Sequence, residues 1–127
     1  MKTLSNIKRR RGAKQPAKPV DRQRRSTGAA PTDVANLAEV FNALSNPTRL
    51  RIMLALRPRE GAAQPERCVS EIAEIVQASE SMTSHQLRLL RRVGLVDSRR
   101  AGKLMFYRMA EGPLDHLLGD GLAYVAR

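Results

Sequence analysis

The chain has 127 residues, of which 42% are hydrophobic and only 3% aromatic, and it contains no tryptophan. This length fits one domain with a possible appendage, and the core must be aliphatic. The single cysteine, Cys68, excludes an intramolecular disulfide framework and suggests a reducing compartment. The chain contains no run of about 18 apolar residues, so we expect no membrane-spanning segment.

The net charge of +11 is unevenly distributed along the chain. Residues 1–30 hold ten lysines and arginines against one acid, Asp21, and so carry +9 of this charge. Residues 1–31 also lack apolar periodicity, which predicts a disordered basic tail before a folded domain over residues 32–127. Three interpretations of the tail stay open: a solubilising segment, a segment that attracts phosphates without sequence preference, or an Arg-rich transit peptide.

Apolar residues at helical spacing predict two helices at the start of the domain. The first covers "DVANLAEVFNALS", residues 33–45. The second begins after Asn46, a good N-cap, has Pro47 in its first turn and ends near Arg57-Pro58. Residues 57–67 are expected to form a loop.

A helix–turn–helix is predicted next. A short helix covers residues 70–76, with Ser70 as a plausible cap, and "QAS" forms a tight connection. The following helix begins at Ser79 or Glu80 and ends near Val93, where Gly94 closes it.

The end of the chain predicts a hairpin and one more helix. Two β-prone runs, "LVDSRR" and "KLMFYRM", flank Ala101-Gly102. An apolar stripe then predicts a helix over residues 114–125, weakened by Gly119 and Gly121. The expected fold is therefore mostly α with a small β-hairpin, in the order helix, helix, helix–turn–helix, hairpin, helix.

The predicted helix over residues 80–93 has two faces of different chemistry. The apolar face is expected to meet the core, with Met82 and Leu89 beside it; it carries Thr83, Leu87, Leu90 and Gly94. The opposite face holds no acid and consists of Ser81, His85, Arg88 and Arg92. Crowded arginines repel one another unless phosphates neutralise them, so this face fits a recognition helix in a DNA major groove. A solvated charged face is the alternative.

The tip of the predicted hairpin is also basic. Arg99, Arg100 and Lys103 surround it, and a basic wing there would reach the DNA backbone or the minor groove. The alternative is an ordinary charged turn that protects a sheet edge. Two basic elements beside one helix–turn–helix favour nucleic-acid binding.

Four segments together resemble the ArsR/SmtB family of bacterial winged helix–turn–helix repressors: "NALSNPTRLRIMLAL", "SEIAEIV", "SESMTSHQLRLLRRVGLV" and "RRAGKLMFYRM". The resemblance implies a homodimer formed by the first and last helices, with two recognition helices in successive major grooves of an operator. It implies base contacts near Ser79, Glu80, Ser81, Ser84 and His85. It implies backbone and wing contacts from Arg88, Arg99, Arg100 and Lys103.

This sequence departs from the family's pattern at three positions of the recognition helix. Met82 and Thr83 stand where relatives often have a polar residue and a valine, and Thr83 would pack by its methyl group. Glu80, often glutamine in relatives, cannot donate to a base, so it would favour a cytosine amino group or repel phosphates.

The resemblance also allows the family's metal sites to be checked by residue. The thiol site reads "CVS", so Cys68 remains and Ser70 replaces the second thiol. The zinc site would fall on Glu111, Pro113, Tyr124 and Arg127, of which only the first is a suitable ligand. We therefore expect no metal site and no cofactor.

Two other sensor sites are conceivable in this sequence. An improvised metal site at His116, near Asp115 and Asp120, is not favoured because helix neighbours diverge. Cys68 is either a small residue at a helix start or a redox group, including through a Cys68–Cys68 link between subunits.

The sequence favours a cytoplasmic, nucleoid-associated homodimeric repressor that binds double-stranded operator DNA. The alternative is a sequence-indifferent nucleic-acid binder driven by the basic tail. An interaction module with the same fold stays open. An enzyme has little support, since no loop cradles phosphate or activates a nucleophile. The effector is left open among a partner protein, an organic molecule, oxidation or none.

Overall fold

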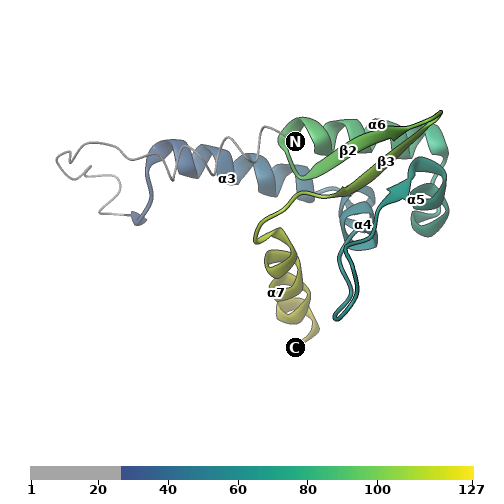
Figure 1. Ribbon diagram of the computed structural model, residues 1–127. Coiled ribbons are helices and arrows are strands. Elements are labelled where there is room, and N and C mark those ends of the chain that lie inside the picture. Colours follow the sequence, from purple (N-terminus) through teal and green to yellow (C-terminus); the bar gives the residue numbers. More distant parts are fainter. Residues whose placement is uncertain (1–26) are drawn as a thin grey trace.

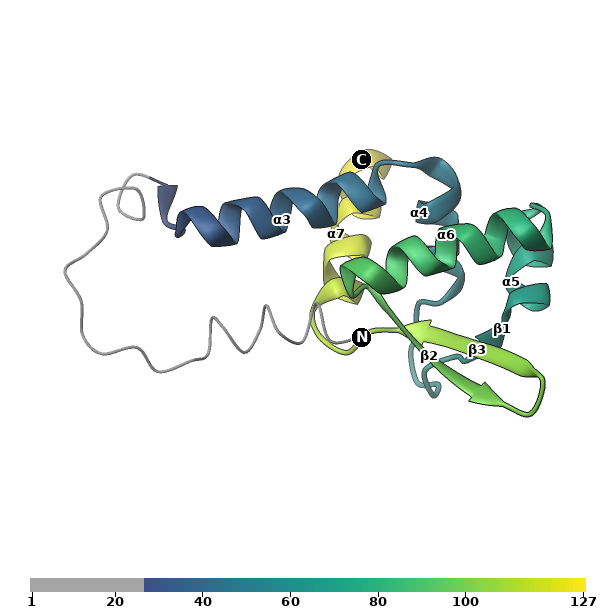
Figure 2. The same ribbon diagram turned by 90° about the horizontal axis from the view of Figure 1, so that it is seen from above.

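A computed structural model describes residues 27–127 of the chain (Figures 1 and 2). Its elements in order are α3 (Pro31–Leu44), α4 (Pro47–Ala55), β1 (Arg67–Cys68), α5 (Val69–Val76), α6 (Glu80–Val93), β2 (Val96–Ala101), β3 (Leu104–Met109) and α7 (Leu114–Ala126). The predicted order of helices and hairpin is confirmed. Most of the predicted tail lies outside the described residues, and Pro31, which was assigned to the tail, is the first residue of α3.

The helix ends follow the local signals in the sequence. The Asn46 side chain accepts a hydrogen bond from the Arg49 backbone N–H at 3.1 Å, and Pro47 occupies the first turn of α4. The Ser79 hydroxyl accepts from the Met82 backbone N–H at 3.1 Å. Gly94, with φ of 92°, closes α6 in the left-handed conformation. These predicted boundaries are confirmed.

Two predictions for the segment before the helix–turn–helix were wrong. Ser70 does not cap α5; the helix begins at Val69, and Cys68 is its N-cap, with the Glu71 carboxylate accepting from the Cys68 backbone N–H at 2.9 Å. Arg67 was assigned to a loop but forms β1 with Cys68, which pairs antiparallel with β3. Cys68 serves both elements because a strand residue and an N-cap share an extended backbone.

The wing is therefore a three-stranded antiparallel sheet in the order β1-β3-β2. Strands β2 and β3 pair from Val96 opposite Met109 to Ala101 opposite Leu104. The turn between them consists of Gly102 and Lys103, one residue later than predicted. Only the first of these has a positive φ, of 62°, which is the pattern of a type II′ hairpin turn.

The core is aliphatic, as predicted, and lies where α4, α5 and α6 meet the sheet. Its fully buried side chains are Ile52, Met53, Leu56, Ile72, Leu87, Leu90, Leu95 and Val96, with Thr83 beside them. The prediction for Met82 was wrong: this side chain is 48% exposed, and Gln86 is buried instead. Together α5, α6 and the sheet form a winged helix–turn–helix.

Helices α3 and α7 extend away from this core (Figure 1). Leu114 and Leu118 anchor α7, and the Arg57 guanidinium pairs with Asp115 at 2.6 Å. Both helices expose large apolar side chains, namely Val34, Leu37, Phe41, Leu117, Leu122, Tyr124 and Val125. No helix among residues 27–127 is long and apolar enough to cross a membrane.

Candidate nucleic-acid interface

Helix α6 lies at the top of the domain in Figure 1, and the residues of its polar side are exposed to solvent. Its apolar side is fixed by the burial of Thr83, Leu87 and Leu90 in the core. The predicted contact residues Ser79, Glu80, Ser81, His85, Arg88 and Arg92 are all exposed, and Ser84 is half-buried. The structure therefore brings the predicted residues of α6 together on its accessible side.

Several of these polar groups are already oriented by hydrogen bonds within the chain. The Ser79 oxygen caps the helix, and its hydroxyl lies 3.5 Å from that of Ser81. Arg88 donates from Nη1 to the Ser84 hydroxyl, one helical turn back, at 3.0 Å. A guanidinium carries five N–H donors, so Arg88 keeps donors for an external acceptor while its position along the helix is held.

The wing arginines differ in their surroundings. Arg99 donates from Nε and Nη2 to the two carboxylate oxygens of Glu66, at 2.7 and 2.8 Å. Its guanidinium also lies over the Phe106 ring, 5.0 Å from the centroid. Hydrogen bonds from Arg99 hold the pKa of Glu66 below its usual value, and the bonds to Glu66 raise the pKa of Arg99. The Arg99 guanidinium is therefore already paired with a carboxylate of its own chain.

The other two wing cations, Arg100 and Lys103, are exposed, and their side chains make no hydrogen bond or ion pair within residues 27–127. Arg100 is adjacent to Arg99 in β2, so it projects from the opposite face of the pleat. Lys103 occupies the turn. Of the three predicted wing contacts, Arg100 and Lys103 are thus the cations free to meet a phosphate.

The side-chain pair that connects α6 to α4 was not predicted from the sequence. Gln86 is only 8% exposed, and its side-chain oxygen accepts a hydrogen bond from Arg49 of α4. The available signal was a polar residue placed three after Thr83 and four before Leu90, both on the apolar face. A buried amide at such a position needs a partner, and Arg49 supplies it.

The predicted sensor residues are dispersed. Among residues 27–127, no group of three or more His, Cys, Asp and Glu side chains could hold a metal ion. Glu111 lies 3.8 Å from Arg108, and His116 and Tyr124 are exposed on α7. Cys68 is buried, with its sulfur 3.2 Å from the Ser70 hydroxyl. A disulfide between two copies of Cys68 would first require this thiol to be uncovered.

The chain is similar in sequence to known bacterial regulatory proteins. The family described as "Bacterial regulatory protein, arsR family" matches residues 46–98. A transcriptional repressor SmtB homolog from Synechocystis is 43% identical over 81 residues, which cover 64% of this chain and 57% of that protein. This chain thus spans less than two thirds of that relative.

Two further proteins match over more of their length. The HTH-type transcriptional regulator NmtR from Mycobacterium tuberculosis is 32% identical over 111 residues, which cover 87% of this chain and 80% of that protein. The solution structure of a homodimeric winged helix–turn–helix DNA-binding domain from Mycobacterium bovis, described as a possible ArsR-family transcriptional regulator, is similar with a TM-score of 0.65. It is 29% identical, and the match covers 87% of this chain and 91% of that one. By its sequence and by its fold, the chain belongs to the ArsR/SmtB family of winged helix–turn–helix transcriptional regulators.

Proposed function

We propose that the protein is a homodimeric, sequence-specific transcriptional repressor that binds operator DNA through α6 and the wing. The observation that carries this proposal is the exposed row Ser81, His85, Arg88 and Arg92, which contains no acid and lies on a helix fixed by a buried opposite face. Hydroxyl, imidazole and guanidinium groups can read base edges, and guanidinium groups also hold phosphates.

In this proposal the N-terminal half of α6 enters the major groove. Base contacts come from the residues near its start, namely Ser79, Glu80, Ser81, Ser84 and His85. Glu80 accepts from a cytosine amino group if it reaches a base. Arg88 and Arg92 hold the helix in the groove, and Arg100 and Lys103 contact the neighbouring backbone. Arg99 joins them only if DNA displaces Glu66.

The dimer is proposed to form through α3 and α7. Val34 and Leu37 are 50% exposed and Phe41 is 51% exposed in the single chain, although all three are large and apolar. Leu117 and Tyr124 share one face of α7, since they are seven residues apart. An apolar surface of this kind typically marks a protein interface, and the similar Mycobacterium bovis domain is described as homodimeric. Two-fold symmetry would place the two α6 helices about 34–36 Å apart, one turn of DNA.

The proposed regulator acts in the bacterial cytoplasm, at the nucleoid, without the family's metal-sensing ligand sets. Its activity would then respond to a partner protein, to an organic effector, to oxidation of Cys68 or to no effector.

The test is a fluorescence-anisotropy titration of the protein on its own upstream region and on a scrambled duplex of equal length, at about 150 mM salt, with and without EDTA. We expect a preference above roughly 10³ for the upstream region, unchanged by EDTA. Affinity should also fall about 10³–10⁵-fold between 50 and 200 mM salt if six to ten phosphates are contacted. A metal-responsive regulator would instead change its preference with EDTA.

The dimer is tested separately by sedimentation of the Phe41→Glu variant. This change places a charge in the proposed interface and should give a monomer with much weaker operator binding. Ala35→Glu adds the same charge to another exposed face of α3 and should remain dimeric. A dimeric Phe41→Glu protein would contradict the proposed interface.

A second candidate function is sequence-indifferent nucleic-acid binding, which the charge of +9 on residues 1–30 favours. Equal binding to both duplexes would support it. Deleting residues 1–26 would then abolish most binding, whereas under the operator proposal the deletion weakens both complexes by a similar factor and preserves the preference.

A further inference from the structure

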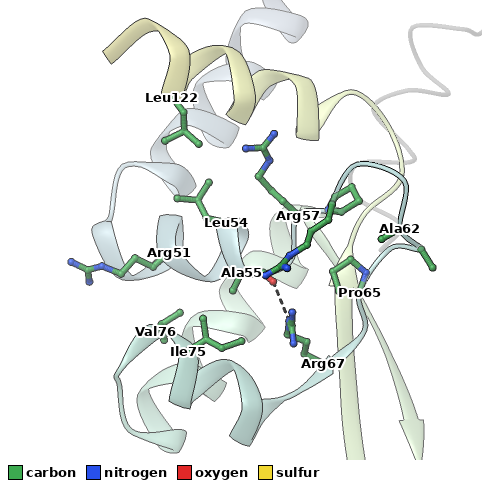
Figure 3. A pocket seen from close by; sticks show the side chains of 13 residues that line it. Arg51, Leu54, Ala55, Arg57, Ala62, Pro65, Arg67, Ile75, Val76 and Leu122 are labelled. Carbon is green, nitrogen blue, oxygen red and sulfur yellow. Dashed lines mark hydrogen bonds between the residues drawn. The ribbon is translucent and has the colours of Figure 1, made fainter. Parts of the chain in front are cut away.

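A cavity lies next to α7 (Figure 3), and none of its lining residues belongs to α6. It has a volume of about 790 Å³ and is lined by residues of α4, the loop after it, β1, α5 and α7. Four lining residues are arginines: Arg51, Arg57, Arg59 and Arg67. The remaining lining residues are all apolar, and none is acidic.

The larger apolar side chains of the cavity come from three separate helices. Leu54 of α4 and Leu122 of α7 lie on one side, and Ile75 and Val76 of α5 lie on the other (Figure 3). Ile75 is 49% exposed and Leu122 is 42% exposed, so much of this apolar surface faces the open cavity. Covering it with an apolar group would remove unfavourable contact with water.

The four arginines fall into two classes. Arg57 is paired with Asp115 at 2.6 Å, and Arg67 donates from Nε to the Ala55 carbonyl at 3.2 Å. These contacts hold both side chains in place and leave other N–H donors available. The guanidinium groups of Arg51 and Arg59 make no hydrogen bond or ion pair within residues 27–127. Two positive charges beside the apolar walls therefore lack a counter-charge in the described part of the chain.

We propose that this cavity binds an amphipathic organic anion, a molecule with one carboxylate, sulfonate or phosphate group and an apolar body. Guanidinium groups bind such head groups through paired, charge-assisted hydrogen bonds. The apolar side chains of the cavity would contact the apolar part of the ligand. The cavity volume lies within the range of roughly 300–1,000 Å³ typical of small-molecule sites. An inorganic anion would leave the apolar side chains exposed to water, and a neutral hydrocarbon would leave the arginines without a counter-charge.

Two other occupants fit the cavity less well. Residues 1–30 of the same chain carry a charge of +9, so the arginines repel them. A second copy of the chain would use the face of α7 that holds Leu117 and Tyr124, whereas Leu122 lines the cavity on a different face. We therefore expect the cavity to stay accessible in the dimer proposed above.

The test uses the full chain without DNA and 8-anilinonaphthalene-1-sulfonate as the probe, because its fluorescence rises when its rings leave water. We expect saturable binding at one site per subunit, and displacement by decanoate but not by decanol or inorganic phosphate. The double variant Arg51→Gln/Arg59→Gln should weaken binding of the probe and of decanoate at least about tenfold. Ile75→Asn changes only an apolar wall of the cavity. It should weaken the binding of decanoate but leave the salt dependence of probe binding, which reports on the arginines, largely unchanged.

The matched control is Arg100→Gln/Lys103→Gln, which removes the same charge from the wing and should change binding less than about twofold. The proposal is overturned if both double variants weaken binding equally, if neither does, if inorganic phosphate displaces the probe as well as decanoate does, or if the folded protein does not bind the probe. Circular dichroism of each variant establishes that it is folded. Because no DNA is present, failure here is distinguishable from failure of the proposed operator binding.

Discussion

The Arg49 guanidinium donates a hydrogen bond to the Gln86 side-chain oxygen at 3.0 Å, and its Nε donates to the Ala43 carbonyl at 2.6 Å. One side chain of α4 therefore joins the end of α3, the proposed dimer helix, to the middle of α6, the proposed reading helix. The angle between the two recognition helices of a dimer would depend on this connection, since each α6 is held to its own α3 through Arg49.

We expect Gln86→Leu to lower operator affinity about tenfold and the free energy of unfolding by about 1–3 kcal/mol, because Nη1 of Arg49 loses its acceptor while Nε keeps the Ala43 carbonyl. Affinity for a scrambled duplex should fall much less, since phosphate contacts do not require the same alignment. Gln86→Glu keeps an acceptor for Arg49 and should restore much of the preference. The measurements are anisotropy titration and urea unfolding. An unchanged preference in a folded Gln86→Leu protein would mean that Gln86 has a purely structural role.

Arg88→Ala should remove most of the operator preference. Arg88 is exposed in the polar row and aligned by the Ser84 hydroxyl, so its loss removes a positioned donor rather than a diffuse charge. We expect a loss of about 1–3 kcal/mol in operator binding and a smaller loss on scrambled DNA. Arg51→Ala removes the same charge from the far side of the domain and serves as the control. Equal effects of the two variants would show that the proposed orientation of α6 is wrong.

Thr83→Val should stabilise the protein. Thr83 is fully buried, and its hydroxyl has no hydrogen-bond partner within the described residues. Replacing the hydroxyl with a methyl group of similar size should raise the free energy of unfolding by about 1 kcal/mol. Thr83→Ser keeps the hydroxyl but removes the methyl group, and it should lower stability by about 1 kcal/mol. Urea unfolding distinguishes the two, and a destabilised valine variant would indicate that the hydroxyl does find a partner.

Glu71 should make stability fall in acid. The hydrogen bond from the Cys68 backbone N–H holds the pKa of Glu71 below its ordinary value of 4.5. A carboxylate with a lower pKa in the folded state contributes stability above its unfolded pKa and loses it as pH falls through the folded pKa. The free energy of unfolding should therefore fall below about pH 4.5, and less steeply in Glu71→Gln. Glu74→Gln, on the same helix, is the control and should retain the slope of the parent protein.

The elements with local signals were predictable from the sequence. Asn46-Pro47, Ser79 and Gly94 mark helix ends because each satisfies or terminates backbone hydrogen bonding within a few residues. The exposed polar face of α6 followed from its period of 3.6 residues, which the burial of Leu87 and Leu90 on the opposite face confirms.

Features that depend on tertiary contacts were not predictable. Strand β1 has two residues, too few to show a period, and exists because β3 pairs with it. Gln86 is buried, and Met82 is exposed, because the Gln86 amide has a partner in Arg49, 37 residues earlier in the chain. The pairing of Arg99 with Glu66 likewise joins residues 33 positions apart. The sequence therefore could not show which of Arg99 and Arg100 is paired within the chain.

The pleat of the wing has a consequence for how this family can diversify. Arg99 faces Phe106 and Glu66, and Arg100 faces the other way, because neighbours in a strand alternate sides. Inserting or deleting one residue between Val96 and Arg99 would reverse this parity and exchange the faces of the sheet on which the two arginines lie. Two such changes would restore it. Odd and even indels in β2 would therefore act differently in evolution, the first re-aiming a cation and the second only altering the reach of the wing.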